Sequence, residues 1–276
     1  MSTQQFPVVL TTEGAAADNE DVVGDNVSVV NEMYLALLNA DEIAPNALRS
    51  YFVDFYLTAA LDGGFAQYVF MTPDREELDG YIREGLEGMG AKGHLELFNR
   101  TAALYELLSE ADTAAYLEDE VDQSADRSDG VAALEALDSE FEELLETEDV
   151  TGLNAQWLRG QDGLLILNAD DLRAHIEARV GTVTDLEERR MEAELEDAPE
   201  FELIIRELCE LAGHTLEKII MGDPHYARNG DTVLAWHFRT NKGDFIMLDD
   251  DIEAVMIDPA TRQTLATVEF DPADLA

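Results

Sequence analysis

Apolar residues recur every three or four positions through the first two thirds of the chain, the spacing that gathers them on one face of an α-helix. The stripes predict amphipathic helices in five segments: Val30–Leu38, Leu48–Ala59, Leu78–Met89, Leu95–Leu108 and Leu134–Leu145. Residues 170–196 are interpreted as connecting helices, one of which begins at the capping-box pattern Thr184-Asp185-Leu186-Glu187. This part of the chain is therefore predicted to be helical.

The pattern differs at both ends of the chain. Residues 1–24 are small, polar and acidic without sustained periodicity, which indicates a mobile acidic arm or one short strand from Phe6 to Leu10. Towards the C-terminus a helix is predicted from Pro199 to Ala212, where Gly213 ends it. Period-two alternation and turn residues then predict strands at 215–221, 232–240, 244–249, 253–258 and 263–270.

Together these elements predict an α+β protein, with an N-terminal all-helical domain followed by a small C-terminal α+β domain with an antiparallel sheet. We expect the acidic arm to cover residues 1–24, the helical domain residues 25–180, and the α+β accessory domain residues 181–276.

The stretch LDGGFAQYVFMT, residues 61–72, interrupts the helical pattern with two adjacent glycines and three aromatic residues. Glycine enters the left-handed backbone region at little steric cost, so Gly63 and Gly64 are expected to end the preceding helix. The aromatic run at 65–70 is interpreted as a short buried helix or turn. Thr72 and Pro73 are then expected to open the next helix.

The excess of acidic residues is the most unusual property of the composition. The chain has 61 Asp and Glu residues against 17 Lys and Arg, a formal net charge of -44. Such a protein repels nucleic acids and anionic membranes and attracts basic proteins or cations. Among the basic residues, lysine occurs only at Lys92, Lys218 and Lys242, a bias typical of halophilic proteomes or GC-rich coding.

Neither a basic leader nor an apolar run of roughly 18 residues is found, so we expect a cytoplasmic protein that does not bind membranes. The single cysteine, Cys209, rules out an intramolecular disulfide.

The glycine and aromatic residues resemble the motif of the DNA mimic protein 19 family. The matching residues are Gly63, Gly64, Phe65, Gln67, Tyr68 and Phe70. The segment Leu137-Asp138-Ser139-Glu140-Phe141 is similar to the family's later Leu-Asp-x-x-Phe/Tyr segment, and Met71 stands where the family usually has asparagine. The resemblance spans roughly residues 28–160. It implies an all-helical domain that mimics double-stranded DNA, occupies the DNA-binding face of a basic partner such as a transcription factor, and has no catalytic activity.

A DNA mimic must present carboxylates at a density comparable with that of phosphates. A protein of 30.6 kDa has about 12,000 Å² of surface, roughly 190 Å² per acidic side chain, whereas duplex DNA has about 107 Å² per charge. Mimicry therefore needs clustering, and the alternative is an evenly acidic surface adapted to salt. The candidate partner-binding residues are Glu118, Asp119, Glu120 and Asp122, and Glu135, Asp138, Glu142 and Glu146. A further acidic cluster is formed by Glu187, Glu188, Glu192 and Glu196.

Other chemistry has little support in the sequence. The five histidines are scattered without metal-ligand spacing, and no nucleotide or nucleophile motif is present, so no catalytic residue, cofactor or metal is predicted. A hydrolase-like site around His237 would need a pocket that joins it to His225 and Trp236. A further alternative is an immunity-type protein that neutralises a basic toxin.

Overall fold

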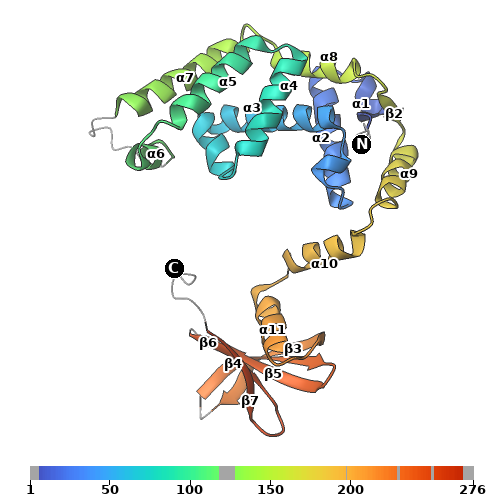
Figure 1. Ribbon diagram of the computed structural model, residues 1–276, viewed down its shortest axis with the longest axis vertical. Helices are drawn as coiled ribbons and strands as arrows, with labels where there is room; N and C mark the ends of the chain where they lie inside the picture. Colours follow the sequence, from blue (N-terminus) through green and yellow to red (C-terminus); the bar gives the residue numbers. More distant parts are fainter. Residues whose placement is uncertain (1–5, 118–127, 197, 229–230, 250–251, 270–276) are drawn as a thin grey trace. The chain divides into compact units, whose positions relative to one another are not determined.

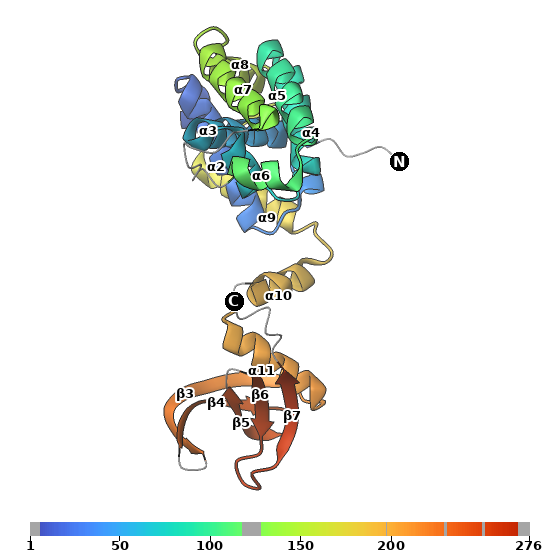
Figure 2. The same ribbon diagram turned by 90° about the vertical axis from the view of Figure 1, so that its left-hand side faces the viewer.

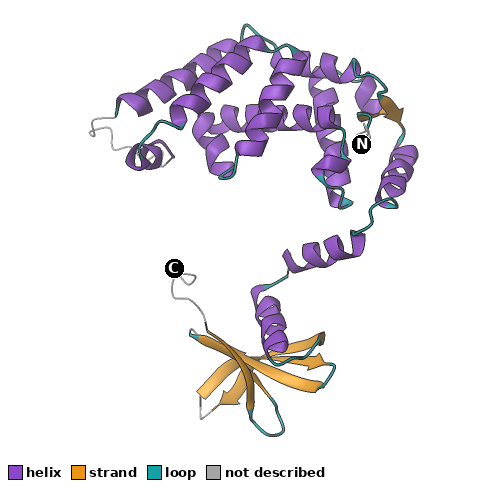
Figure 3. Ribbon diagram, in the orientation of Figure 1, coloured by secondary structure: helices purple, strands orange, loops and turns teal. Residues whose placement is uncertain are grey.

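A computed structural model describes residues 6–117, 128–196, 198–228, 231–249 and 252–269 (Figure 1). The chain divides into two compact units, Met1–Leu186 and Glu187–Ala276. The first unit is built mainly from helices and the second from one helix-covered antiparallel sheet, as Figure 3 shows. The predicted α+β fold class is confirmed. The division falls six residues after the expected boundary at residue 180.

The first unit contains one small two-stranded sheet and a series of helices. In chain order these are β1 (Val9–Thr11), α1 (Thr12–Ala16), α2 (Asn19–Leu35), the 3-10 turn η1 (Ala40–Glu42), α3 (Pro45–Met71), α4 (Glu76–Met89), α5 (Lys92–Tyr105), α6 (Glu110–Leu117), α7 (Asp129–Leu145), α8 (Val150–Arg159), β2 (Leu165–Leu167) and α9 (Ala169–Val180).

Residues 6–24 do not form the expected mobile arm. Strand β1 pairs in parallel with β2, and Val9 and Leu10 are almost fully buried. Helix α2 begins at Asn19, where the Asp18 carboxylate accepts a hydrogen bond from the Asp21 N–H. The prediction of an arm was wrong for residues 6–24, whereas its alternative, one short strand from Phe6 to Leu10, is met in part by β1. The strand pairs with residues more than 150 positions later in the chain, a contact that local patterns do not show.

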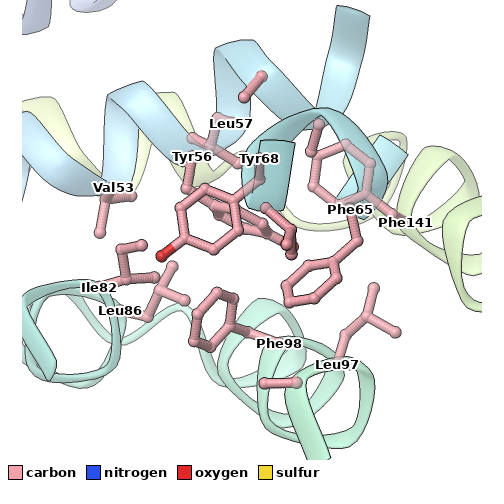
Figure 4. Close-up of a cluster of buried hydrophobic side chains, with 14 of the residues drawn as sticks. Val53, Tyr56, Leu57, Phe65, Tyr68, Ile82, Leu86, Leu97, Phe98 and Phe141 are labelled. Carbon is pink, nitrogen blue, oxygen red and sulfur yellow. The ribbon is translucent and has the colours of Figure 1, made fainter. Parts of the chain in front are cut away.

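Helix α3 contributes to both hydrophobic cores of the first unit. Its first turns place Ala47 and Leu48 in a core with β1, α2, α8 and α9. Its later turns place Tyr56, Phe65 and Tyr68 in a second core with α4, α5 and α7. Figure 4 shows the rings of this second core converging with Phe98. Each buried aromatic side chain removes 150 to 250 Å² from water at roughly 25 cal/mol per Å², so this core accounts for much of the unit's stability.

In Figure 2, α5 and α7 lie next to each other along the same side of the first unit, and the two helices are in contact. Helix α7 also contacts α3, so the acidic face of α7 and the glycine pair of α3 are held on neighbouring elements.

The second unit is a meander with helix α11 on one face. Its elements are α10 (Leu186–Glu196), which spans the boundary, α11 (Glu200–Leu211), β3 (Leu216–Arg228), β4 (Asp231–Thr240), β5 (Gly243–Asp249), β6 (Glu253–Ile257) and β7 (Thr264–Glu269). The strands pair in sequence order and all pairs are antiparallel. Leu208 of α11 packs against Phe238 and Met247 on one face of the sheet. Among the described residues, no helix is both long and apolar enough to span a membrane.

Candidate functional site at the kink of α3 and the face of α7

The glycine pair interrupts α3. Gly63 (φ -158°, ψ 34°) and Gly64 (φ 68°, ψ -165°) are non-helical, so α3 consists of two helical segments joined by a kink, the second of which ends at Met71. The glycines thus end the first segment as predicted, and the aromatic run that follows is a short helix. The prediction that Thr72 opens the next helix was wrong, because its hydroxyl donates to the Tyr68 carbonyl at the end of α3, and α4 begins at Glu76.

Gly64 is required at this position for two reasons. Its positive φ of 68° lies in the left-handed region that residues with a Cβ atom rarely adopt. A Cβ atom there would also lie 2.9 Å from Cγ of Asp138 in α7. The glycine thus lets α7 approach the kink closely enough for a direct hydrogen bond.

Asp138 caps the resumed part of α3 from the neighbouring helix. Its Oδ1 atom accepts a hydrogen bond of 2.8 Å from the Phe65 N–H, and its Oδ2 atom accepts one of 3.0 Å from the Tyr116 hydroxyl. A negative charge at this end of a helical segment is favourable. Burial nevertheless raises the pKa of the Asp138 carboxyl, although both hydrogen bonds oppose that shift. The two segments that resemble the DNA mimic family, at Gly63–Phe70 and Leu137–Phe141, therefore meet at one carboxylate.

Two of the motif aromatics are buried, as expected. Phe65 is 2% exposed and Tyr68 is fully buried. The Tyr68 hydroxyl donates a 2.7 Å hydrogen bond to Oδ1 of Asp79. Arg75 pairs with Asp79 and Glu106, and its guanidinium lies 5.6 Å from the centre of the Phe65 ring. A polar network thus surrounds the aromatic core at this end of the molecule.

Phe70 is the exception to the expected burial of the aromatic run. It is 70% exposed, and Leu61 and Met71 are 65% and 50% exposed. These three side chains lie along two adjoining hollows of about 560 Å³ and 500 Å³, which share Leu61, Asp62 and Gln67. The apolar side chains at the kink therefore form the edge of a concave surface.

The structure separates the predicted acidic residues of α7 into two groups. Glu142 and Glu146 are exposed and Glu135 is partly exposed along the outer side of the helix. Asp138 points inward, so the predicted row of four loses one member. Glu140 is also unavailable, because it makes two hydrogen bonds of 2.7 and 2.9 Å with Arg100. Glu118, Asp119, Glu120 and Asp122 lie outside the described residues.

The arginines of the helical unit are used in internal contacts. Arg49 pairs with Glu84, and Arg159 donates to the carbonyl of Ala17 and to the Asn19 side chain. The same holds for the other described arginines of this unit, which are Arg75, Arg83, Arg100, Arg173 and Arg179. These arginines are therefore committed to internal contacts, and the ion pairs of the described residues include neither Glu142 nor Glu146.

Trp236 and His237, two of the side chains that chemistry at His237 needs, lie on opposite faces of the sheet. Trp236 stacks on Phe201 of α11, with ring centres 3.7 Å apart. His237 is the next residue along strand β4 and so points to the opposite face of the sheet, where its ring lies 6.3 Å from that of Tyr226. The structure thus separates two of the three side chains that the hydrolase-like hypothesis needs.

Sequence reasoning missed the structural roles of Asp138, Tyr116 and Asp79. One signal was readable: Asp138 lies four residues after Leu134 and three before Phe141, which places it on the buried side of α7. Tyr116 gave no comparable signal, because its partners come from α3 and α7.

The fold and site define an acidic helical domain in which a kinked helix is capped by a partly buried carboxylate from a neighbouring helix. Residues 41–161 match the family described as DMP19-like protein, which confirms the predicted resemblance over this segment. The match includes the kink of α3 and all of α7. No curated protein and no solved structure matches the chain.

Proposed function

We propose that the helical unit acts as a DNA mimic, binding a basic protein such as a transcription factor on the surface that otherwise takes DNA. The observation that carries this proposal is the outer side of α7, where Glu135, Glu142 and Glu146 form a row of carboxylates. The family match over residues 41–161 supports it. In this role the protein binds and does not catalyse.

The excess of negative charge supports binding to a basic surface. The accessible surface of 16536 Å², shared among 61 acidic side chains, gives about 270 Å² per carboxylate against about 107 Å² per charge on DNA. The average surface is therefore much less charged than DNA. Recognition has to use local clusters such as the α7 row, where nearby arginines are paired internally.

The spacing of the carboxylates within the row indicates how much of the phosphate pattern of DNA α7 can reproduce. At 1.5 Å rise per residue, Glu142 and Glu146 are about 6 Å apart along the axis, and Glu135 and Glu142 are about 10.5 Å apart. One strand of DNA has a phosphate every 3.4 Å or so. Helix α7 thus reproduces part of the charge pattern of DNA. In this proposal the partner also contacts other acidic helices of the unit.

Competition with DNA tests the proposal. Tagged full-length protein is used to capture partners from a lysate, and duplex DNA is added to the retained complex. We expect a DNA-binding protein to be retained, to be released by duplex DNA, and to dissociate as salt is raised, because the Debye length falls to about 3 Å at 1 M. Retention of a partner that duplex DNA does not displace would contradict mimicry.

A matched pair of variants locates the contact. Glu142→Gln, Glu143→Gln and Glu146→Gln together remove three exposed charges from α7, and about tenfold weaker binding, near 1.4 kcal/mol, is expected. The control combines Glu20→Gln, Asp21→Asn and Glu32→Gln, which removes three exposed charges from α2, outside the family match. Equal weakening by both triples would mean that net charge alone drives binding.

A further inference from the structure

We propose that the two hollows at the α3 kink bind a short segment of the partner in which arginine alternates with large apolar residues. This inference rests on the proposed function in one respect, that the partner is a basic protein. It adds a second, partly apolar contact beside the α7 row. The row would supply long-range attraction, and the hollows short-range selectivity.

The shape of the surface fits an extended peptide. The hollows of about 560 Å³ and 500 Å³ share Leu61, Asp62 and Gln67, so they adjoin at these side chains beside the kink. Phe70 lies in the first hollow and Met71 in the second. An extended chain places alternate side chains on one face, about 6.6 Å apart, so neighbouring pockets suit every second residue.

The exposure of the apolar side chains around the hollows supports a binding surface. Leu61, Phe70 and Met71 are each at least half exposed; Leu61 lines both hollows, Phe70 the first and Met71 the second. Single exposed apolar residues are ordinary, whereas several that line adjoining hollows indicate a contact surface. Burial by a partner's leucine or phenylalanine would remove this area from water.

The negative charge of the first hollow favours a basic residue in the bound segment. Asp62, Asp138 and Glu142 line the first hollow, and among the described residues neither hollow is lined by arginine, lysine or histidine. Asp62 and Glu142 are exposed where they line this hollow, so their carboxylates are accessible to a cation. A guanidinium group offers five donors in a planar fork that suits carboxylates.

Charge also decides between possible occupants. A second copy of this chain would bring its own net charge of -44 to an acid-lined hollow, and nucleic acid would be repelled for the same reason. A basic peptide meets both the acidic floor and the apolar edge.

Fluorescence anisotropy with a defined probe tests the inference. The probe is a labelled peptide of roughly eight alternating arginine and leucine residues, about 26 Å long when extended, added to the full chain. Two control peptides are used. One has serine in place of leucine, and the other has citrulline, a neutral isostere, in place of arginine. We expect the arginine–leucine peptide to bind at least about tenfold more tightly than either control, and the amide NMR signals of Gly63 and Gly64 to shift on its addition.

Variants assign the contact to the hollows. Phe70→Ser is expected to weaken the arginine–leucine peptide about tenfold, whereas Leu107→Ser should change its affinity less than about twofold. Leu107 is a matched control because it is 81% exposed and does not line either hollow. Asp138 is left intact because it holds α3 and α7 together.

Three results would overturn the inference. They are equal affinity for the leucine and serine peptides, no effect of Phe70→Ser, and concentration-dependent dimerisation that Phe70→Ser abolishes, which would assign the surface to a second copy. None of these affects the proposed function, which fails separately if duplex DNA does not displace the partner.

Discussion

At the scale of single residues, the fold decides which carboxylates can serve a partner. Asp138 and Asp79 look like solvent-facing residues in a chain with 61 acidic residues, yet each accepts internal hydrogen bonds from tyrosine hydroxyls. Neutral and charged donors compensate part of their lost hydration. A count of acidic residues therefore overestimates the charge available at the surface.

Replacing Gly64 tests the requirement for a positive φ beside Asp138. Gly64→Ala introduces strain at φ 68° and a contact of 2.9 Å with Asp138, so we expect a loss of about 1 to 3 kcal/mol of unfolding free energy. Gly80→Ala in α4 is the control, since a Cβ there meets nothing within 4 Å. The Gly80→Ala variant should raise the unfolding free energy by up to about 1 kcal/mol. Urea denaturation measures the unfolding free energy of both variants. An equal change in the two variants would refute the steric explanation.

His94 is expected to make stability depend on pH. Its ring is 1% exposed, packs against Phe141, and has no hydrogen-bond partner for either nitrogen among the described residues. Burial lowers the pKa of His94 below 6.5, and nearby Glu148 opposes this only in part. The unfolded chain therefore binds the proton more readily, so this contribution to stability is present above about pH 6.5 and is lost as the pH falls further.

The variant His94→Phe isolates this effect. The difference in unfolding free energy between wild type and variant, measured from about pH 7.5 to pH 5, should shift in favour of the variant at low pH, by at most about 1.4 kcal/mol per pH unit. A difference that is constant with pH would mean that His94 is not buried in the neutral form.

At the scale of elements, the kink keeps the end of α3 in the second core. The first turns of α3 pack with α2 and α8, the turns around Tyr56 enter the second core, and the segment after Gly64 packs with α5 and α7 in the same core. A straight helix of 27 residues would extend about 40 Å and carry its last turns away from the second core. The resumed segment is short, so its first N–H groups depend on a cap from outside the helix.

Removal of that cap should be costly. Asp138→Ala leaves the Phe65 N–H and the Tyr116 hydroxyl without their partner, and we expect a loss of about 1 to 3 kcal/mol. Tyr116→Phe removes a single hydrogen bond and should cost about 0.5 to 1.5 kcal/mol. The double variant should cost less than the sum, because both changes break the same contact. Glu142→Ala, one turn further along α7, should change stability by less than about 0.5 kcal/mol, and a larger effect there would argue against a specific role for Asp138.

The sequence was most informative where structure is determined locally. The strands at 232–240 and 244–249 were predicted almost to the residue, because alternation and the turn at Asn241–Gly243 are adjacent in the chain. Strand β3 extends to Arg228, beyond the predicted end at 221, because it pairs along the full length of β4.

The site could be predicted only in part. The glycines, the short helix after them and the acidic side of α7 were recognisable, but the cap of that short helix comes from Asp138, which is 74 residues after Gly64. The hollows depend on the same contact, together with Tyr116 and Leu117 from α6. Such contacts join residues that no local pattern connects.

At the scale of the whole molecule, excess charge opposes compactness while it favours a basic partner. The net charge of -44 repels itself over distances of about 10 Å at 0.1 M salt and only about 3 Å at 1 M. Exposed pairs such as Arg100–Glu140 add little to stability in water, so their screening by salt is a smaller effect. Added salt is therefore expected to stabilise the fold and to weaken partner binding.

Opposite responses to salt would separate the two roles of the acidic surface. We expect the thermal unfolding midpoint to rise between about 0.1 M and 1 M NaCl, and to rise less in the variant that combines Glu142→Gln, Glu143→Gln and Glu146→Gln, since it removes three of the repelling charges. Sucrose at matched osmolality controls for effects of solvent exclusion, because it stabilises without screening charge. A midpoint that falls with NaCl would show that ion pairs outweigh repulsion. An adaptation to salt requires only the rise in midpoint, whereas a DNA mimic also requires that its partner dissociates over the same range.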